Sequence, residues 1–296
     1  MNISIIGSNG FLATAIGKYA NAQEWDLYMY GLDAPQYHNY KEFHYLNLLN
    51  DGVDCTHYLG SDMIIYAAGA GVQSYLKESN KLIYALNTTV PVELCRQLKE
   101  ASYKGVFVTF GSVFEMGETS ETHKFTEEEV LLSQGPTQSD YVISKRMLSR
   151  FATSFLHEFT HWHFIIPTIY GEGENPNRLI PYTINAINNG DSLHFTSGEQ
   201  VRQYVYVGEV PVLLTKALEC QLPSGMYNIE GSETLSVRDI VSIIHVSMNK
   251  NLPEDVFGTA ERADSRMKYL ALDGTKLFKA IGYKSNLRIS DVIRNY

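Results

Sequence analysis

Tyr141 and Lys145 lie four residues apart in the segment 136–147, PTQSDYVISKRM, and their types and spacing suit acid–base chemistry. If the segment is helical, residues four apart share one face, so the phenol and the ammonium lie close together. A nearby ammonium lowers the pKa of a phenol, which can then exchange a proton near neutral pH. The pattern alone is weak, because a chain with 20 tyrosines contains it by chance. A second copy, Tyr37 and Lys41, falls in a loop-like stretch containing Pro and Asn, and we interpret it as accidental.

A serine upstream strengthens the first copy. Ser112 directly follows the apolar run 105–111, GVFVTFG, which the sequence predicts to be a buried strand. Ligands of doubly wound sheets bind beyond the carboxyl ends of the strands, where Ser112 would lie. We therefore interpret Ser112, Tyr141 and Lys145 as an acid–base unit in which the serine holds a substrate oxygen.

The scaffold for this unit is visible in the order of apolar runs. Through the first 165 residues, short apolar runs alternate with longer helical patterns, and several runs are apolar without alternation, as in parallel strands buried on both faces. Strand–helix–strand repetition predicts an α/β fold with a doubly wound parallel sheet, a Rossmann fold. The predicted strands are 3–7, 26–31, 63–69, 105–111 and 162–167, and the predicted helices are 79–101 and 137–160.

The pattern changes after residue 170. The segment 171–178, GEGENPNR, is rich in Gly, Asn and Pro and is typical of a loop. Beyond it the strict alternation is lost, which predicts two parts: a dinucleotide-binding domain over 1–170 and a smaller mixed α/β part over 171–296. Two predicted strands, 202–207 and 226–230, can belong to either part, so the parts can interleave.

The start of the chain predicts a dinucleotide site. After the first strand, the segment 7–13, GSNGFLA, leads into a helical stretch. Gly7 permits a tight turn, Gly10 lets backbone amides approach a phosphate, and the helix start adds a positive dipole end. Ala13 stands where a third glycine often sits and is small enough for close packing on the sheet. A lone glycine pair is also compatible with an ordinary strand–helix turn.

The second strand leaves the choice between NAD and NADP open. An acidic residue that holds a ribose hydroxyl is expected at its end, which reads YGLD at 30–33. Gly31 stands at that place, Asp33 follows two residues late, and no nearby arginine suits a 2′-phosphate. Asn47, in LNLLND at 46–51, either faces the adenine or is an ordinary loop residue.

The totals exclude several classes of function. A net charge of −9 argues against nucleic acid or an anionic membrane as the main partner, although it allows a local basic pocket. The three cysteines are far apart and fit a reducing compartment, and His157, His161 and His163 form no metal-binding set. The first apolar run is too short for a signal peptide, and no stretch approaches the roughly 20 apolar residues of a membrane span. We expect a cytoplasmic protein without a metal.

Taken together and in order, the motifs resemble those of the extended short-chain dehydrogenase/reductases, the NAD-dependent epimerase/dehydratase family. The matching segments are 7–13, 66–69, Asn87 with 87–91, 110–117, 136–145, 169–173 and 202–210. The segment 177–210 looks most like that of the reductases of nucleotide-diphosphate 4-keto-6-deoxyhexoses. These include the CDP-abequose and CDP-paratose synthases and dTDP-fucose-forming 4-ketoreductases.

The resemblance implies roles for individual residues. It makes Ser112, Tyr141 and Lys145 catalytic, with NADPH or NADH as cofactor and a nucleotide-diphosphate sugar as substrate. The implied cofactor contacts are Gly7, Asn9, Gly10, Phe11, Leu12, Asp33, Asn47, Leu48, Ala67, Ala68, Gly69, Asn87, Tyr141, Lys145 and Pro167. The implied substrate contacts are Ser112, Thr168, Arg178, Leu179, Arg202 and Arg262, because a diphosphate calls for cations and arginine is its preferred partner. Asn87 is as well explained by a structural amide, and Arg262 is as well explained by a solvated surface arginine.

The resemblance leaves two reactions open. A 4,6-dehydratase of this family places Asp-Glu directly after the hydroxyl residue, but here Val113 and Phe114 follow and cannot transfer protons. Glu115 is one step further on and is expected to point elsewhere. We favour a 4-ketoreductase in deoxysugar biosynthesis for surface polysaccharide such as O-antigen, with a 4-epimerase as the alternative. Ile165, Thr168 and the segment 207–209 depart from the family pattern at the fine substrate contacts.

Two other classes of function compete with this assignment. A non-catalytic nucleotide sensor is disfavoured because Tyr141 and Lys145 are both present, and an oxidoreductase acting on a non-sugar substrate remains a third hypothesis. The family also implies a homodimer formed through the helices 79–101 and 137–160, although their apolar residues can all belong to the core.

Overall fold

The computed structural model describes residues 1–72, 74–155, 159–253, 255–260 and 266–296, and its centre is a seven-stranded parallel sheet. The strand order is β3-β2-β1-β4-β5-β6-β9. All neighbours are parallel, and the chain adds strands on one side of β1 up to β3 and on the other side from β4 onward. This arrangement confirms the predicted doubly wound Rossmann fold. The strands are β1 (Asn2–Ile6), β2 (Asp26–Gly31), β3 (Glu42–Tyr45), β4 (Met63–Tyr66), β5 (Val106–Ser112), β6 (His161–Ile166) and β9 (Gly225–Asn228).

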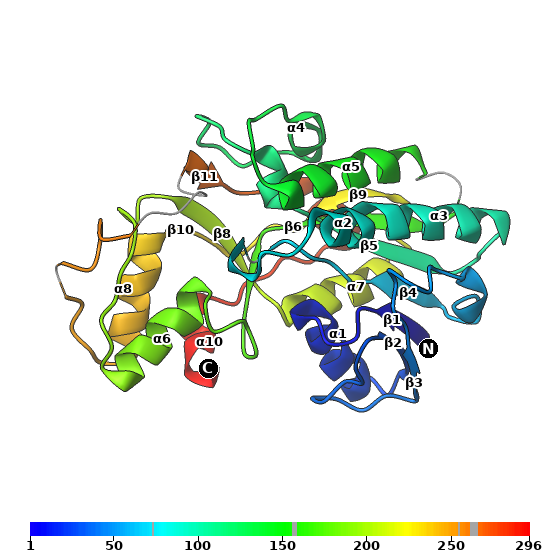
Figure 1. Cartoon of the computed structure of the whole chain (residues 1–296), viewed down its shortest axis with the longest axis horizontal. Helices are drawn as coiled ribbons and strands as arrows, with labels where there is room; N and C mark the ends of the chain where they lie inside the picture. The colour runs from blue at the N-terminus through cyan, green and yellow to red at the C-terminus, as the bar shows by residue number, and fades with distance from the viewer. Residues whose placement is uncertain (73, 156–158, 254, 261–265) are drawn as a thin grey trace.

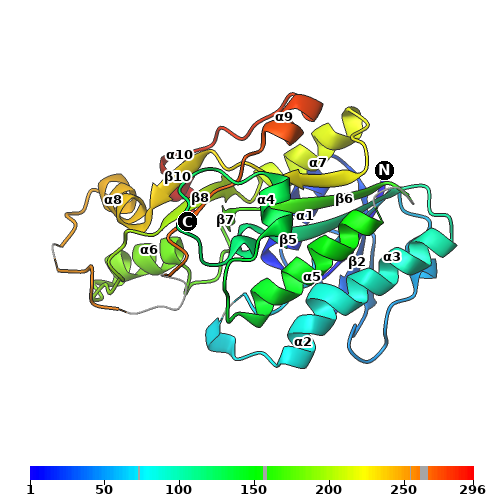
Figure 2. The ribbon, with the colours of Figure 1, turned by 90° about the horizontal axis from the view of Figure 1, so that it is seen from above.

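Different helices cover the two faces of this sheet (Figures 1 and 2). Side chains alternate across a strand, so β1 sends Ile3 and Ile5 to one core and Ile6 to the other. The first core is closed by α1 (Phe11–Ala22), α7 (Glu209–Glu219) and α9 (Thr275–Ile281). The second is closed by α3 (Val90–Glu100) and α5 (Asp140–Ser154), and α2 (Asn80–Tyr84) packs against α5.

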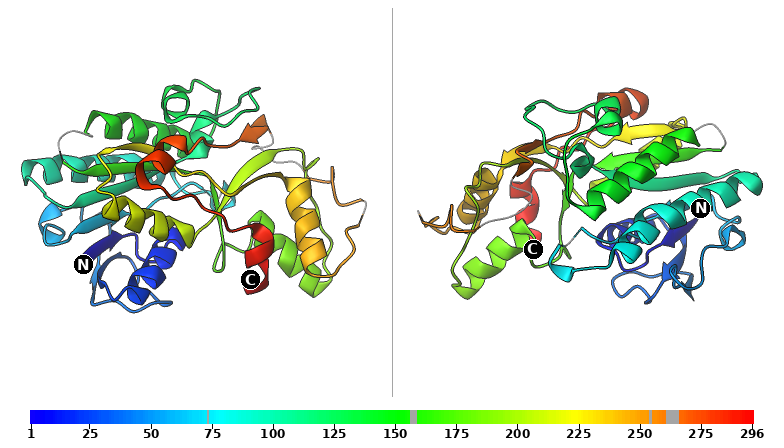
Figure 3. Two further views of the ribbon diagram at one scale, coloured as in Figure 1. Left: turned by 180° about the vertical axis from the view of Figure 1, so that it is seen from behind. Right: turned by 45° about the horizontal axis from the view of Figure 1, so that its top comes forward.

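A second, smaller sheet lies beside the carboxyl ends of the first (Figures 1 and 3). In it, β8 pairs with the three other strands, β10, β11 and β7. Its core is formed with the helices that follow these strands, through Ile180, Ile240 and Ile289 among others. The elements are β7 (Thr168–Tyr170), α6 (Leu179–Asn189), β8 (Val201–Tyr206), β10 (Glu233–Ser236), α8 (Val237–Ser247), β11 (Tyr269–Leu270) and α10 (Ile289–Val292); α4 (Glu127–Leu132) lies over the first sheet.

The two parts interleave along the chain. The predicted strand 226–230 is β9, which extends the first sheet beside β6, whereas the predicted strand 202–207 is β8 of the second sheet. Helices α7 and α9 likewise return to the first core. The chain therefore crosses several times from one sheet to the other.

Some elements differ from the prediction. Strand β3 was not predicted, because its four residues, EFHY, lie at an exposed edge and carry little apolar pattern. The helix expected over 79–101 is α2 and α3 joined by a π-helical turn, Ala85–Thr89. The helix expected over 137–160 begins at Asp140, after the Ser139 cap. Within the described ranges, no helix is long and apolar enough to cross a membrane.

Candidate active site

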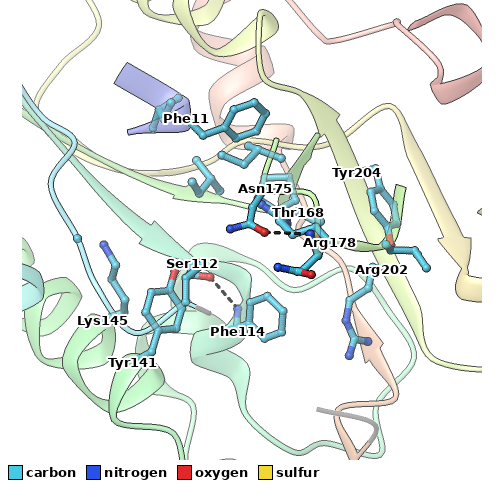
Figure 4. Close-up of a pocket in the computed structure, with 18 of the residues that line it drawn as sticks. Phe11, Ser112, Phe114, Tyr141, Lys145, Thr168, Asn175, Arg178, Arg202 and Tyr204 are labelled. Carbon is cyan, nitrogen blue, oxygen red and sulfur yellow. Dashed lines mark hydrogen bonds between the residues drawn. The ribbon is translucent and has the colours of Figure 1, made fainter. Parts of the chain in front are cut away.

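A cavity of about 450 Å³ lies between the carboxyl ends of the first sheet and the second sheet (Figure 4). Its wall combines the start of α1, the loop after β4, the end of β5, the start of α5, the β6–β7 connection and residues of α6 and β8. Among the sequence-predicted residues, Phe11, Leu12, Ala67, Ala68, Gly69, Ser112, Tyr141, Lys145, Pro167, Thr168, Arg178, Leu179 and Arg202 line it.

The glycine loop has the geometry that a dinucleotide phosphate requires. Gly7 has a φ of +102°, and a Cβ there would lie 2.6 Å from the backbone nitrogen of Ala68, so only glycine fits. Gly10 is the N-cap of α1, no side chain caps this helix, and its first turn holds no acidic residue. The free amides and positive end of α1, at Phe11 and Leu12, therefore point to a place for an anionic group on the cavity wall.

The acid–base residues come from two adjacent elements. Ser112 ends β5, and Tyr141 and Lys145 lie one turn apart on α5, whose start packs against the end of β5. The Ser112 hydroxyl interacts with the Tyr141 phenol and also accepts the backbone N–H of Phe114 at 3.3 Å. Lys145 Nζ donates to the carbonyl of Phe110 at 2.8 Å. All three side chains can therefore meet one ligand oxygen or its neighbours within a single cavity.

The pKa of Tyr141 is raised, not lowered as the sequence predicts. Burial raises the pKa of Tyr141 to about 12, and the interactions with Ser112 and with the charge of Arg178 only partly oppose this. The expected lowering by Lys145 is not found, because this ammonium bonds the carbonyl of Phe110 and burial lowers its own pKa to about 8. Tyr141 is thus a neutral phenol at neutral pH, ready to donate a proton.

Two arginines reach the cavity from the second part of the chain. Arg202 on β8 donates to the carbonyls of Val201 and Met267, and its guanidinium lies 5.8 Å from the ring centre of Phe114. Arg178 precedes α6, and its Nε lies 2.9 Å from a carboxylate oxygen of Glu174. Arg262 lies outside the described residues.

Seven predicted cofactor residues are not in the wall of this cavity: Gly7, Asn9, Gly10, Asp33, Asn47, Leu48 and Asn87. The backbone carbonyl of Asp33 accepts hydrogen bonds from Ser8 and Asn9, which ties the end of β2 to the glycine loop. The side-chain oxygen of Asn47 accepts the Leu49 amide in a local turn, and Leu48 packs on the second core. Contacts of these residues with a cofactor stay predictions.

Asn87 has a structural position. Its side chain is fully buried, accepts the N–H of Ala70, and donates to the carbonyl of Ala70 and to the hydroxyl of Ser144. These bonds tie the loop after β4 to α5, so Asn87 fixes the position of cavity residues rather than lining the cavity.

Sequence reasoning missed the support for Arg178. Glu174 is buried, and its second carboxylate oxygen accepts the phenol of Tyr296 at 2.8 Å. Tyr296 in turn accepts the backbone N–H of Gly171. The spacing of Glu174 and Arg178, four residues, was a usable signal for the ion pair, whereas nothing in the sequence connects Glu174 with Tyr296, 122 residues away.

The fold and the glycine loop agree with the comparison with known families. Residues 3–229, more than half of the chain, match the NAD dependent epimerase/dehydratase family. The chain belongs to this family, which confirms the resemblance inferred from its motifs, and dependence on NAD is part of the family's description.

Individual relatives are more distant. CDP-abequose synthase of Salmonella typhimurium (strain LT2) is 27% identical over 153 residues, 49% of this chain and 51% of the relative. The chain thus matches about half the length of the curated relatives. The UDP-glucose 4-epimerase of Thermotoga maritima has a TM-score of 0.84 at 18% identity, covering 99% of this chain and 96% of that chain. The dTDP-glucose 4,6-dehydratase of Streptomyces venezuelae has a TM-score of 0.82 at 17% identity, covering 99% and 96%. These structures share the fold.

Proposed function

We propose that the protein is a cytoplasmic NAD(P)H-dependent reductase of the 4-keto group of a nucleotide-diphosphate 4-keto-6-deoxyhexose, in deoxysugar biosynthesis for surface polysaccharide. One observation carries the proposal. Ser112, Tyr141 and Lys145 share a single cavity with the start of α1 on one side and with Arg178 and Arg202 on the other. The partial relationship to CDP-abequose synthases supports this substrate class.

The charges of the cavity wall favour a diphosphate. Among the described residues of the wall, Lys145, Arg178 and Arg202 are cationic and none is an aspartate or glutamate. A cavity lined by one sign of charge concentrates ligands of the other sign, although the whole chain carries −9. We assign the cofactor to residues 1–170 and the nucleotide sugar mainly to 171–296, which supplies both arginines.

The chain's own residues account for proton transfer and alignment. When bound, a reduced nicotinamide supplies the hydride for the keto carbon. Tyr141 donates its phenolic proton to the sugar oxygen that gains negative charge, and Ser112 donates a hydrogen bond to the same oxygen. Lys145 holds a positive charge beside them, and the cavity wall fixes the reacting groups in line.

Residues of the same wall support one of the possible reactions over the others. Elimination of water needs a further acid–base pair, but Val113 is buried and Phe114 lies under Arg202. A 4-epimerase must first use Tyr141 as a base, whereas the raised pKa of this tyrosine keeps it in the acid form that reduction consumes. This favours the reductase, with the epimerase as the second candidate.

An assay with reduced cofactor tests the proposal. The protein is incubated with NADH or NADPH and a panel of nucleotide-diphosphate 4-keto-6-deoxyhexoses, and the absorbance of the reduced cofactor is followed. Stoichiometric consumption with formation of the alcohol supports the reductase. Sugar conversion without net consumption identifies the epimerase. No conversion of any panel member, with no thermal stabilisation by nucleoside diphosphates, contradicts both.

A further inference from the structure

A buried carboxyl group lies directly behind the acid–base residues. Glu115 follows Ser112 by three residues, in the 3₁₀ turn Val113–Met116, and its side chain is fully buried outside the cavity. One carboxylate oxygen, Oε1, accepts the backbone N–H of Ser112 at 2.7 Å. A Cβ on Gly111 would lie 2.5 Å from this oxygen, so the missing side chain of Gly111 makes the room for it. The carboxyl group thus fixes the backbone that carries the Ser112 hydroxyl.

The other carboxylate oxygen of Glu115, Oε2, has no such hydrogen-bond donor among the described residues. Within the described part of the chain, Oε2 is buried and makes no hydrogen bond of normal geometry, although the nearby Ser149 hydroxyl lowers the pKa of the carboxyl group. Ser149 lies on the same face of α5 as Tyr141 and Lys145, and its hydroxyl bonds Nε2 of His163 at 2.8 Å. A buried carboxylate with a spare oxygen is costly in a core and calls for a functional explanation.

Charged groups face Glu115 from α5. Lys145 and Arg146 both stabilise its ionised form, while burial disfavours that form and is the larger effect, which raises the pKa of Glu115 to about 7. From β6 it faces His163, whose own pKa burial lowers, so that the imidazole is neutral. The two other elements packed against this turn, α4 and β11, contribute the apolar side chains Val130 and Leu270. Lys145 Nζ donates to the carbonyl of Phe110 at 2.8 Å, and the carboxylate lies against the next residue, Gly111, so the two charges flank the same stretch of β5.

We propose that Glu115 is a positioning residue of the active site, which holds Ser112 through its backbone amide and maintains Lys145 as an ammonium through its negative charge. The role in turnover rests on the proposed function, whereas the coupling to Lys145 does not. Burial works against the charge of Lys145, and Glu115 is the partner that opposes this effect. Without that carboxylate, the ammonium beside Tyr141 would lose its proton at a lower pH.

The test replaces the charge and keeps the shape. In Glu115→Gln, the amide oxygen can still accept the Ser112 N–H, but the negative charge is gone. The protonation of Lys145 is measured without any substrate, by the pH dependence of its trace acetylation followed by mass spectrometry. We expect the apparent pKa of Lys145 to fall by about one unit, the lower end of what a close opposite charge contributes. Glu121→Gln, which removes an exposed carboxylate beside His123, is the matched control and leaves the titration unchanged.

A second variant separates positioning from charge. Glu115→Asp keeps the charge, but the shorter side chain no longer reaches the Ser112 amide. We expect an unchanged Lys145 titration, a loss in kcat of about tenfold or more and little change in KM. Equal Lys145 titrations in wild type and folded Glu115→Gln, or wild-type kcat in Glu115→Asp, overturn the proposal. If the titration shifts but no 4-keto sugar is reduced, the proposed function fails and the link between Glu115 and Lys145 stands.

Discussion

Tyr141 is a phenol whose surroundings keep it protonated until a stronger base appears beside it. The strongest base in a carbonyl reduction is the oxygen that receives the electrons of the carbon–oxygen double bond. A phenol with a raised pKa is therefore matched to the product side of the transfer and gives its proton up only when that oxygen becomes anionic. Arg178 and Ser112 moderate this tendency, because both favour the phenolate that remains.

Tyr141→Phe removes the phenolic proton and keeps the ring, so it tests the role of this proton. We expect kcat to fall by roughly two or more powers of ten, the scale of a lost general acid, while the affinity for reduced cofactor changes little. Steady-state kinetics and fluorescence titration with NADH or NADPH provide the two measurements. Tyr45→Phe, which removes an exposed phenol on β3, serves as the control. Near-normal turnover in Tyr141→Phe would contradict the mechanism.

At the scale of elements, β6 carries two imidazoles into the core. His161 and His163 are fully buried, and both bond the hydroxyl of Thr109 on β5 at 2.8 Å. Burial lowers the pKa of His161 from its ordinary 6.5 to about 3, so the folded chain binds fewer protons than the unfolded chain between these values. This contribution to stability is therefore present above about pH 6.5 and is lost as the pH falls toward about 3.

His161→Asn tests this contribution. Asparagine can retain a hydrogen bond to Thr109 but has no proton to gain. We expect the free energy of unfolding to fall less steeply with acidification than in wild type, by about 1.4 kcal/mol per pH unit. Denaturant titrations at a series of pH values measure the slopes. His57→Asn, at an exposed position, is expected to keep the wild-type slope. Parallel slopes for His161→Asn and wild type would contradict the assignment.

The sequence predicts those helices and strands whose formation depends on neighbouring residues, and it misses those that depend on contacts with distant parts of the chain. Strands β1, β2, β4, β5 and β6 were predicted because each lies in a short, mostly apolar run between helical patterns. The glycine loop was predicted because the positive φ of Gly7 is a demand of the turn itself, although its close approach to Ala68 is a long-range contact. Strand β3 and the π-helical turn at Asn87 were not, since an exposed edge and a single buried amide leave no periodic pattern.

Some residues of the candidate active site were predictable from the sequence, and others were not. The order of motifs along the chain predicted that Ser112, Tyr141 and Lys145 would be neighbours, and the structure places them in one cavity. The residues that support this site could not be predicted from the sequence. The contacts of Ser149 with His163 and of Glu174 with Tyr296 depend on how helices and strands pack. Even the sign of the pKa change at Tyr141 was mistaken, because burial outweighs charge there.

At the scale of the whole molecule, α5 presents an apolar strip to solvent. Ile143 and Met147 lie one turn apart on this helix and are 36% and 49% exposed. The homodimer that the family resemblance implies would cover this strip. We expect the double variant Ile143→Glu, Met147→Glu to elute as a monomer of 33.4 kDa in light-scattering chromatography, with wild type at twice that mass. Phe278→Glu, an exposed apolar position on α9, is the control, and a monomeric wild type would rule out this dimer.

The insertion of β9 beside β6 has a consequence for how the chain becomes a protein. A nascent chain that has emerged only as far as residue 170 has an open sheet whose last strand, β6, offers unpaired backbone groups and the uncovered side chains of Trp162 and Phe164. This edge of β6 is covered only after Gly225–Asn228, which follows β7 and β8 of the second sheet, has emerged and paired with β6. Residues 1–170 therefore do not complete the first sheet by themselves, and a cut after residue 170 would leave an exposed edge strand rather than an independent module.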